Sequence, residues 1–140
     1  MKKLIFISAL FTISIFTFAC SSGGGNSATG KAVKTDTVNN LTVTLATESG
    51  AMKNGANDFT LTFADASGKP VDVGAVSLNF YMPAMGSMAA MNDAATLTTT
   101  ATPGIYRGKA KIESAGEWQA QIAYEGTAGK GKTSFSVTAQ

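Results

Sequence analysis

From residue 41 onward, apolar and polar side chains alternate in short runs. In Leu41 to Leu45, for example, leucine and valine alternate with threonine. Successive side chains of a β-strand point to opposite faces, so this pattern predicts strands with one buried and one solvated face. Such strands are predicted in seven stretches, of which the threonine-rich 94–100 is the weakest: 41–45, 59–63, 76–80, 94–100, 106–112, 118–124 and 135–137.

Turn-forming residues separate these stretches, as in Asn54-Gly55, Ser67-Gly68-Lys69-Pro70, Pro103-Gly104 and Ala115-Gly116. No stretch has the spacing of a convincing amphipathic helix. About seven short strands in about 100 residues predict an all-β, immunoglobulin-like antiparallel β-sandwich. Trp118 is the expected centre of its core, because a large aromatic side chain buries more apolar surface than any other.

The first 20 residues follow a different pattern. Lys2 and Lys3 precede an apolar run, 4–18, that is short for a membrane span and typical of a secretory signal peptide. The run ends at Ala19-Cys20, a small residue followed by the only cysteine, which is the lipobox pattern of bacterial lipoproteins. We therefore predict a signal peptide at 1–19 and a lipidated Cys20 that anchors the mature chain to a membrane.

The region after the cysteine is rich in glycine and serine. We predict a lipidated, flexible linker over 20–38 and a β-sandwich domain over 39–140. Ser21 occupies the position where inner-membrane lipoproteins of enterobacteria carry aspartate. In a host with two membranes, the expected location is therefore the outer membrane, facing the periplasm.

Charge and composition narrow the classes of function. Without the signal peptide, nine basic residues balance nine acidic ones, so no surface for nucleic acid is predicted. The chain has no histidine, which removes Ser-His-Asp and Cys-His catalysis and imidazole zinc sites. We predict a non-enzymatic protein without a small-molecule substrate. Its expected contacts are the membrane, through the lipid, and a protein partner in the cell envelope.

The residues most able to bind a ligand lie in a methionine run. Four methionines recur at every third position: Met82, Met85, Met88 and Met91. Thioether sulfur is a soft, uncharged ligand that suits Cu(I). Because a proline and a glycine interrupt regular structure, we predict a loop over 82–91 that wraps around one Cu(I) ion. The predicted metal ligands are Met82, Met85 and Met88, with Met91 as an alternate.

Two other roles fit the same methionines. Methionine is a flexible filler of apolar cores, and Met82 continues the alternation of Leu78 and Phe80. Methionine is also favoured on adaptable surfaces that contact other proteins. The residues alone therefore leave three alternatives: a Cu(I) site, packing in the core or loop, and a protein-contact surface.

Six short motifs follow one another in a fixed order: GANDF (55–59), DASGKPV (65–71), AVSL (75–78), MPAM (82–85), PGIY (103–106) and AGEW (115–118). Together they resemble the YtkA-like family, which is related to FixH-type proteins, over about Val38 to Gln140. The resemblance implies an immunoglobulin-like sandwich in the cell envelope, often tethered to a membrane. For some relatives it implies a link to copper handling or cytochrome oxidase assembly. The Met-Pro-x-Met motif carries over to Met82 and Met85, and the absence of histidine favours Cu(I) over Cu(II).

Overall fold

The computed structural model describes residues 30–140; the predicted signal peptide, Cys20 and the linker before residue 30 lie outside the described residues. Among the described residues, no helix is long and apolar enough to cross a bilayer. They form nine strands: β1 (Lys31–Val38), β2 (Leu41–Thr47), β3 (Gly55–Ala64), β4 (Ala75–Met82), β5 (Met91–Ala94), β6 (Thr96–Thr99), β7 (Ile105–Ile112), β8 (Gly116–Gly126) and β9 (Gly129–Ala139).

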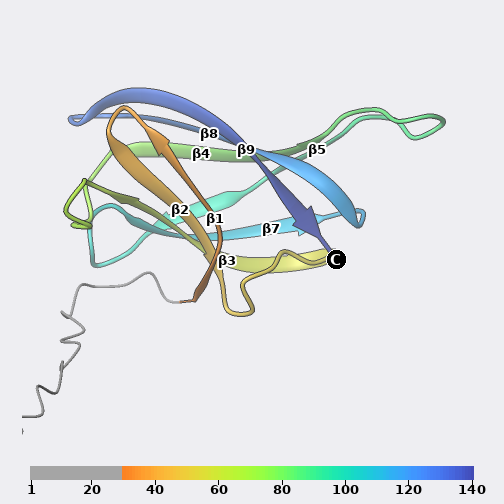
Figure 1. The fold of residues 1–140 in the computed structure, drawn as a ribbon, viewed down its shortest axis with the longest axis horizontal. Coiled ribbons are helices and arrows are strands. Elements are labelled where there is room, and N and C mark those ends of the chain that lie inside the picture. The colour runs from red at the N-terminus through yellow and green to blue at the C-terminus, as the bar shows by residue number, and fades with distance from the viewer. Residues whose placement is uncertain (1–29) are drawn as a thin grey trace, which may run out of the picture.

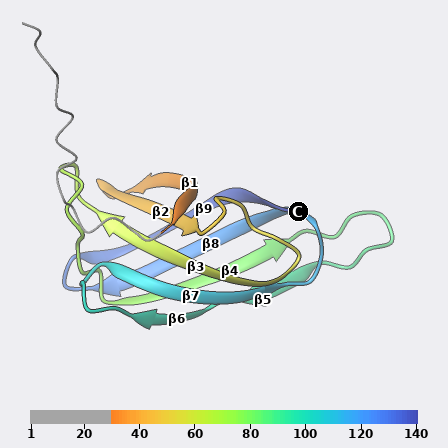
Figure 2. The same cartoon turned by 90° about the horizontal axis from the view of Figure 1, so that it is seen from below.

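The strands form two antiparallel sheets that pack face to face (Figures 1 and 2). The first sheet has the order β1-β2-β3-β7-β6 and the second the order β5-β4-β8-β9. Every strand pair within the two sheets is antiparallel. The predicted all-β sandwich is therefore confirmed.

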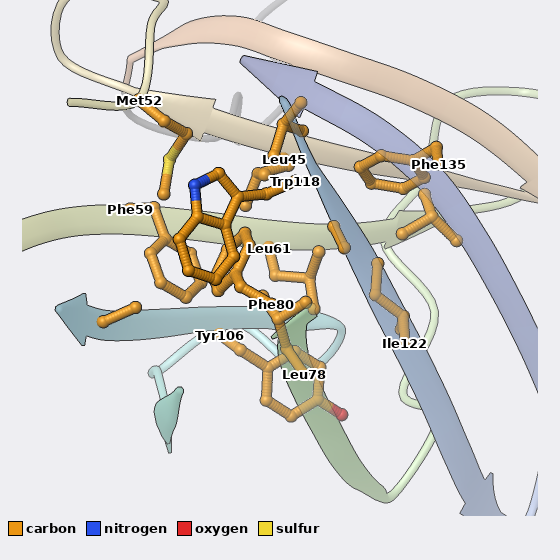
Figure 3. Close-up of a cluster of buried hydrophobic side chains, with 14 of the residues drawn as sticks. Leu45, Met52, Phe59, Leu61, Leu78, Phe80, Tyr106, Trp118, Ile122 and Phe135 are labelled. Atoms are coloured by element: carbon orange, nitrogen blue, oxygen red, sulfur yellow. The ribbon is translucent and has the colours of Figure 1, made fainter. Parts of the chain in front are cut away.

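The core lies between the sheets and is built from the inward positions of the alternating runs. Trp118 is fully buried, as are Phe63 and Phe80, and Figure 3 shows its indole ring among the surrounding apolar side chains. The indole N–H donates a hydrogen bond to the Ser114 carbonyl at 2.9 Å. Burial of each such large side chain contributes roughly 1.5–3 kcal/mol to the stability of the folded state. Trp118 thus lies in the core, where the alternating pattern places it.

The predicted linker over 20–38 is wrong in its second part, because residues 31–38 form β1 at one edge of the first sheet. Only Val33 and Val38 of this strand pack against the core. A β-bulge between Ala32 and Lys34 shifts the register and interrupts the alternation. The strand therefore has too few regularly spaced apolar residues to be recognised from its pattern, and the domain begins at β1 instead of at residue 39.

The weak strand predicted at 94–100 is two strands in different sheets. β5 pairs with β4 in the second sheet, and β6 pairs with β7 in the first. Between them, Ala95 packs against the core and donates its backbone N–H to the Leu78 carbonyl at 2.9 Å. The chain crosses from one sheet to the other at this residue and closes one side of the sandwich.

Candidate functional site: the methionine hairpin

The methionine run, residues 82–91, forms a β-hairpin that extends beyond the end of the sandwich between β4 and β5 (Figure 1). Met82 lies opposite Met91, and Met85 lies opposite Met88. Met85 and Met88 exchange two backbone N–H···O bonds of 3.1 and 2.9 Å. The predicted loop thus lies at one end of the sandwich, since residues 83–90 belong to neither strand. What the spacing did not show is the isolated Met85–Met88 bridge, which has the same register as β4 and β5 and makes the loop a methionine hairpin.

A two-residue turn, Gly86-Ser87, closes the hairpin. Gly86 has a φ of 57°, whereas Ser87 is not among the residues with positive φ. Positive φ at the first central residue alone is the mark of a type II′ turn, whose twist matches that of paired strands. A Cβ at Gly86 would meet no atom within 4 Å. The backbone conformation, and not a lack of space, therefore requires glycine here.

The register sorts the four methionines into an inner pair, Met82 and Met91, and a tip pair, Met85 and Met88. Residues three apart on a strand point to opposite faces. Met82 is 2% exposed and Met91 packs against the core, whereas Met85 and Met88 are 58% and 48% exposed. The structure thus does not bring Met82 together with Met85 and Met88, the three ligands predicted from the spacing.

The inner pair belongs to the core. Met82 lies in the same buried cluster as Phe80 and Trp118. Its Cε atom would be 3.0 Å from a Cβ placed on Gly116, so the methyl group packs closely against that glycine. Met82 therefore continues the buried face of β4, and its sulfur is shielded from solvent.

The tip pair lies in a different environment. Every residue from 83 to 90 is exposed and none is charged. Directly opposed residues of a hairpin have Cβ atoms about 5 Å apart, so two flexible thioethers at these positions can reach one ion. Thioether sulfur needs no deprotonation before it binds a metal. The tip pair can therefore offer two soft ligands to Cu(I) at any physiological pH.

Charged side chains do not form an alternative metal site in the part of the chain that the structure describes, which has no suitable group of three or more acidic, histidine or cysteine residues. Asp65 accepts hydrogen bonds from the Ser67 hydroxyl at 2.6 Å and from the backbone N–H groups of Ser67 and Lys69. These bonds, the hydroxyl first, lower the pKa of the Asp65 carboxyl below its usual value. The DASGKP segment is thus a hydrogen-bonded turn.

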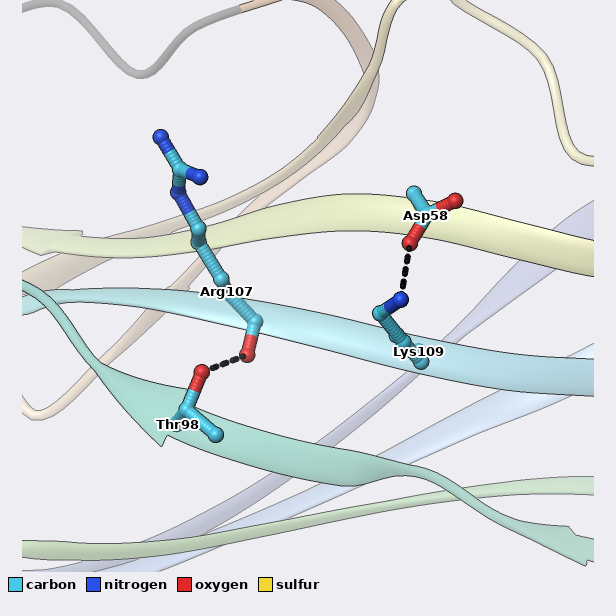
Figure 4. Close-up of polar contacts among 4 residues, drawn as sticks. All are labelled: Asp58, Thr98, Arg107 and Lys109. Atoms are coloured by element: carbon cyan, nitrogen blue, oxygen red, sulfur yellow. Dashed lines mark hydrogen bonds and ion pairs between the residues drawn. The ribbon is translucent and has the colours of Figure 1, made fainter.

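A shallow groove of about 630 Å³ lies on the first sheet and is lined in part by Thr98, Arg107 and Lys109. In Figure 4, the Thr98 hydroxyl donates to the Arg107 carbonyl at 3.4 Å, and Lys109 pairs with Asp58 at 3.5 Å. The side chains of this ion pair are 82% and 81% exposed. Solvent therefore screens their attraction, and we interpret the groove as a solvated strand face.

A family model described as YtkA-like matches residues 35–123, which is more than half of the chain. The matched segment begins within β1, includes the whole methionine hairpin and ends within β8. A comparison with curated proteins found no match. The family match confirms the resemblance indicated by the ordered motifs.

Proposed function

The chain belongs to the YtkA-like family, and we propose that it is a lipid-anchored, non-enzymatic envelope protein that carries Cu(I) on its methionine hairpin. The observation that supports this most is the tip pair, two opposed and exposed thioethers at the end of a projecting hairpin. Two sulfur ligands leave coordination positions of Cu(I) open to a further soft ligand. Such a site suits an ion that is held briefly and passed to an envelope partner.

The proposed anchor fits this role. In this proposal Cys20 carries the lipid, and in a host with two membranes Ser21 favours the outer membrane, with the domain on its periplasmic side. Lipidation also consumes the only thiol of the chain, a ligand that would otherwise compete with the thioethers for Cu(I). The hairpin would then be the accessible soft-metal site.

A Cu(I) competition titration with a chromogenic chelator, under reducing conditions, tests the assignment. The protein is residues 20–140 with Cys20→Ser, so that no thiol contributes. We expect Met85→Leu/Met88→Leu to weaken Cu(I) binding at least about tenfold, a loss of about 1.4 kcal/mol. The matched control Met82→Leu/Met91→Leu changes the inner pair and should bind Cu(I) as the parent does.

Two results would contradict this assignment. Weaker binding in the inner-pair variant only would move the site into the core. Equal affinity in the parent and in both variants would remove the methionines as Cu(I) ligands altogether.

The exposed, uncharged hairpin tip also supports a second candidate, an apolar surface for protein contact. Leucine keeps the size and apolar character of methionine but has no sulfur. A contact surface should therefore tolerate Met85→Leu/Met88→Leu and fail in Met85→Asp/Met88→Asp. Copper transfer should fail in both variants, so this pair of substitutions separates the two candidates.

A further inference from the structure

The methionines of the described region differ widely in their access to solvent. Met85 and Met88 are 58% and 48% exposed, whereas Met52 and Met82 are 1% and 2% exposed. Met91 is partly buried against the core. Oxidation of a thioether requires the oxidant to reach the sulfur atom, so its rate follows exposure. The fold thus presents two thioethers to solvent and protects the others.

We propose that Met85 and Met88 form a reversible oxidation site, at which hydroperoxides convert the two thioethers to methionine sulfoxides. A sulfur lone pair attacks one peroxide oxygen, the O–O bond breaks and the S–O bond forms. Sulfur is oxidised by two electrons, and hydrogen peroxide leaves as water. Reversal by a dithiol-dependent sulfoxide reductase returns the thioether, with a disulfide and water as products.

The hairpin tip can accept this modification without loss of the fold. The two backbone hydrogen bonds between Met85 and Met88 do not involve the side chains, and residues 83–90 are all exposed. A sulfoxide at Met82 would instead place a polar oxygen in the cluster that contains Phe80 and Trp118. Oxidation confined to the tip therefore leaves the core intact. Both residues are exposed, and the hairpin that carries them projects from the sandwich (Figure 1), so a reductase can reach them.

Oxidation of these residues would regulate the site described under Proposed function, and this step depends on that proposed function. A sulfoxide presents a hard oxygen, whereas Cu(I) prefers soft sulfur ligands. The ion should therefore leave the tip pair when both residues are oxidised and bind again after reduction.

A time course with hydrogen peroxide, followed by peptide mass spectrometry of the full chain in detergent, tests the oxidation site. Met85 and Met88 should gain oxygen at least about tenfold faster than Met52 and Met82, with Met91 between them. Methionine sulfoxide reductase with a dithiol should remove that oxygen. Equal rates at exposed and buried methionines, or unfolding in step with oxidation of the tip, would overturn the proposal.

Cu(I) titration of untreated, oxidised and re-reduced samples separates this proposal from the copper function. Affinity that falls at least about tenfold and then recovers supports regulation of the site. A chain that never binds Cu(I) but shows the expected order of oxidation supports the oxidation site and removes the copper function. Unchanged Cu(I) affinity after complete oxidation of Met85 and Met88 overturns the regulation. In the control Met85→Leu/Met88→Leu, peroxide should leave residues 85 and 88 unmodified.

Discussion

Asp36 in β1 accepts a hydrogen bond from the hydroxyl of Thr133 in β9. This bond, and a second from the backbone N–H of Thr37, lower the pKa of the Asp36 carboxyl below its usual value. A group whose pKa is lower in the folded state stabilises the fold above its unfolded-state pKa. That stabilisation is lost as the pH falls through the folded-state pKa. Asp36 is only half-buried, so solvent screening keeps the contribution small.

Asp36→Asn should therefore lower the free energy of unfolding at neutral pH by about 1 kcal/mol or less. The ordinary pKa of an aspartate carboxyl is 3.8. The difference in the free energy of unfolding between parent and variant should shrink as the pH falls below that value, and it should vanish below the folded-state pKa of Asp36. Urea unfolding at a series of pH values measures this difference in the free energy of unfolding. Asp58→Asn, in the exposed ion pair with Lys109, is the control and should have a smaller effect at neutral pH. A difference that grows toward acid pH would contradict this linkage.

At the scale of elements, alternation predicted those strands that bury large side chains at every second position. β8 is the clearest case, because Trp118, Ile122 and Tyr124 all lie on its buried face. The methionine hairpin was not predicted, because Pro83 and Gly86 were interpreted as breaks in regular structure. The signal that could have identified it is Gly-Ser at the centre of the symmetric segment MPAMGSMAAM, since such a pair is typical of two-residue hairpins.

The candidate site shows the same limit of sequence reasoning. Spacing by three singled out the four methionines as one candidate site. It could not show that cross-strand pairing separates the four sulfurs into a buried inner pair and an exposed tip pair, because that follows from the hairpin register. Met82 lies on the continued core face of β4, whereas Met85 and Met88 are exposed to solvent.

Gly86→Val should loosen the tip of the hairpin. A β-branched residue at positive φ costs roughly 1–3 kcal/mol of backbone strain, and no core contact compensates for it. We expect faster amide hydrogen exchange at Met85 and Met88. The thermal midpoint should change little, because residues 83–90 lie outside the core. Ser87→Ala alters the other turn residue without positive φ and serves as the control. Unchanged exchange in Gly86→Val would show that the turn does not hold the tip pair.

At the scale of the whole molecule, the two sheets are joined along both sides. On one side the chain crosses between the sheets at Ala95. On the other, Thr133 of β9 donates to Asp36 of β1. In the turn that follows β1, the Asn39 amide donates to the Tyr124 hydroxyl of β8 at 3.2 Å and to the Lys130 carbonyl of β9 at 3.1 Å. Asn39 and Asn40 have φ values of 48° and 64°, a type I′ turn that pairs β1 with β2. This Asn-Asn turn is the sequence signal for β1 that its irregular alternation obscured.

A comparison of two truncated chains tests whether β1 is part of the domain. A chain that begins at Gly30 keeps β1, whereas one that begins at Asn39 loses the core contacts of Val33 and Val38 and the Asp36–Thr133 bond. Together these losses should cost about 3 kcal/mol or more. For a domain of this size that lowers the thermal midpoint by roughly 10 °C, which calorimetry would measure. The shorter chain also uncovers the edge of β2, so light scattering should detect self-association. Equal midpoints and two monomeric chains would show that β1 is dispensable and return the start of the domain to residue 39.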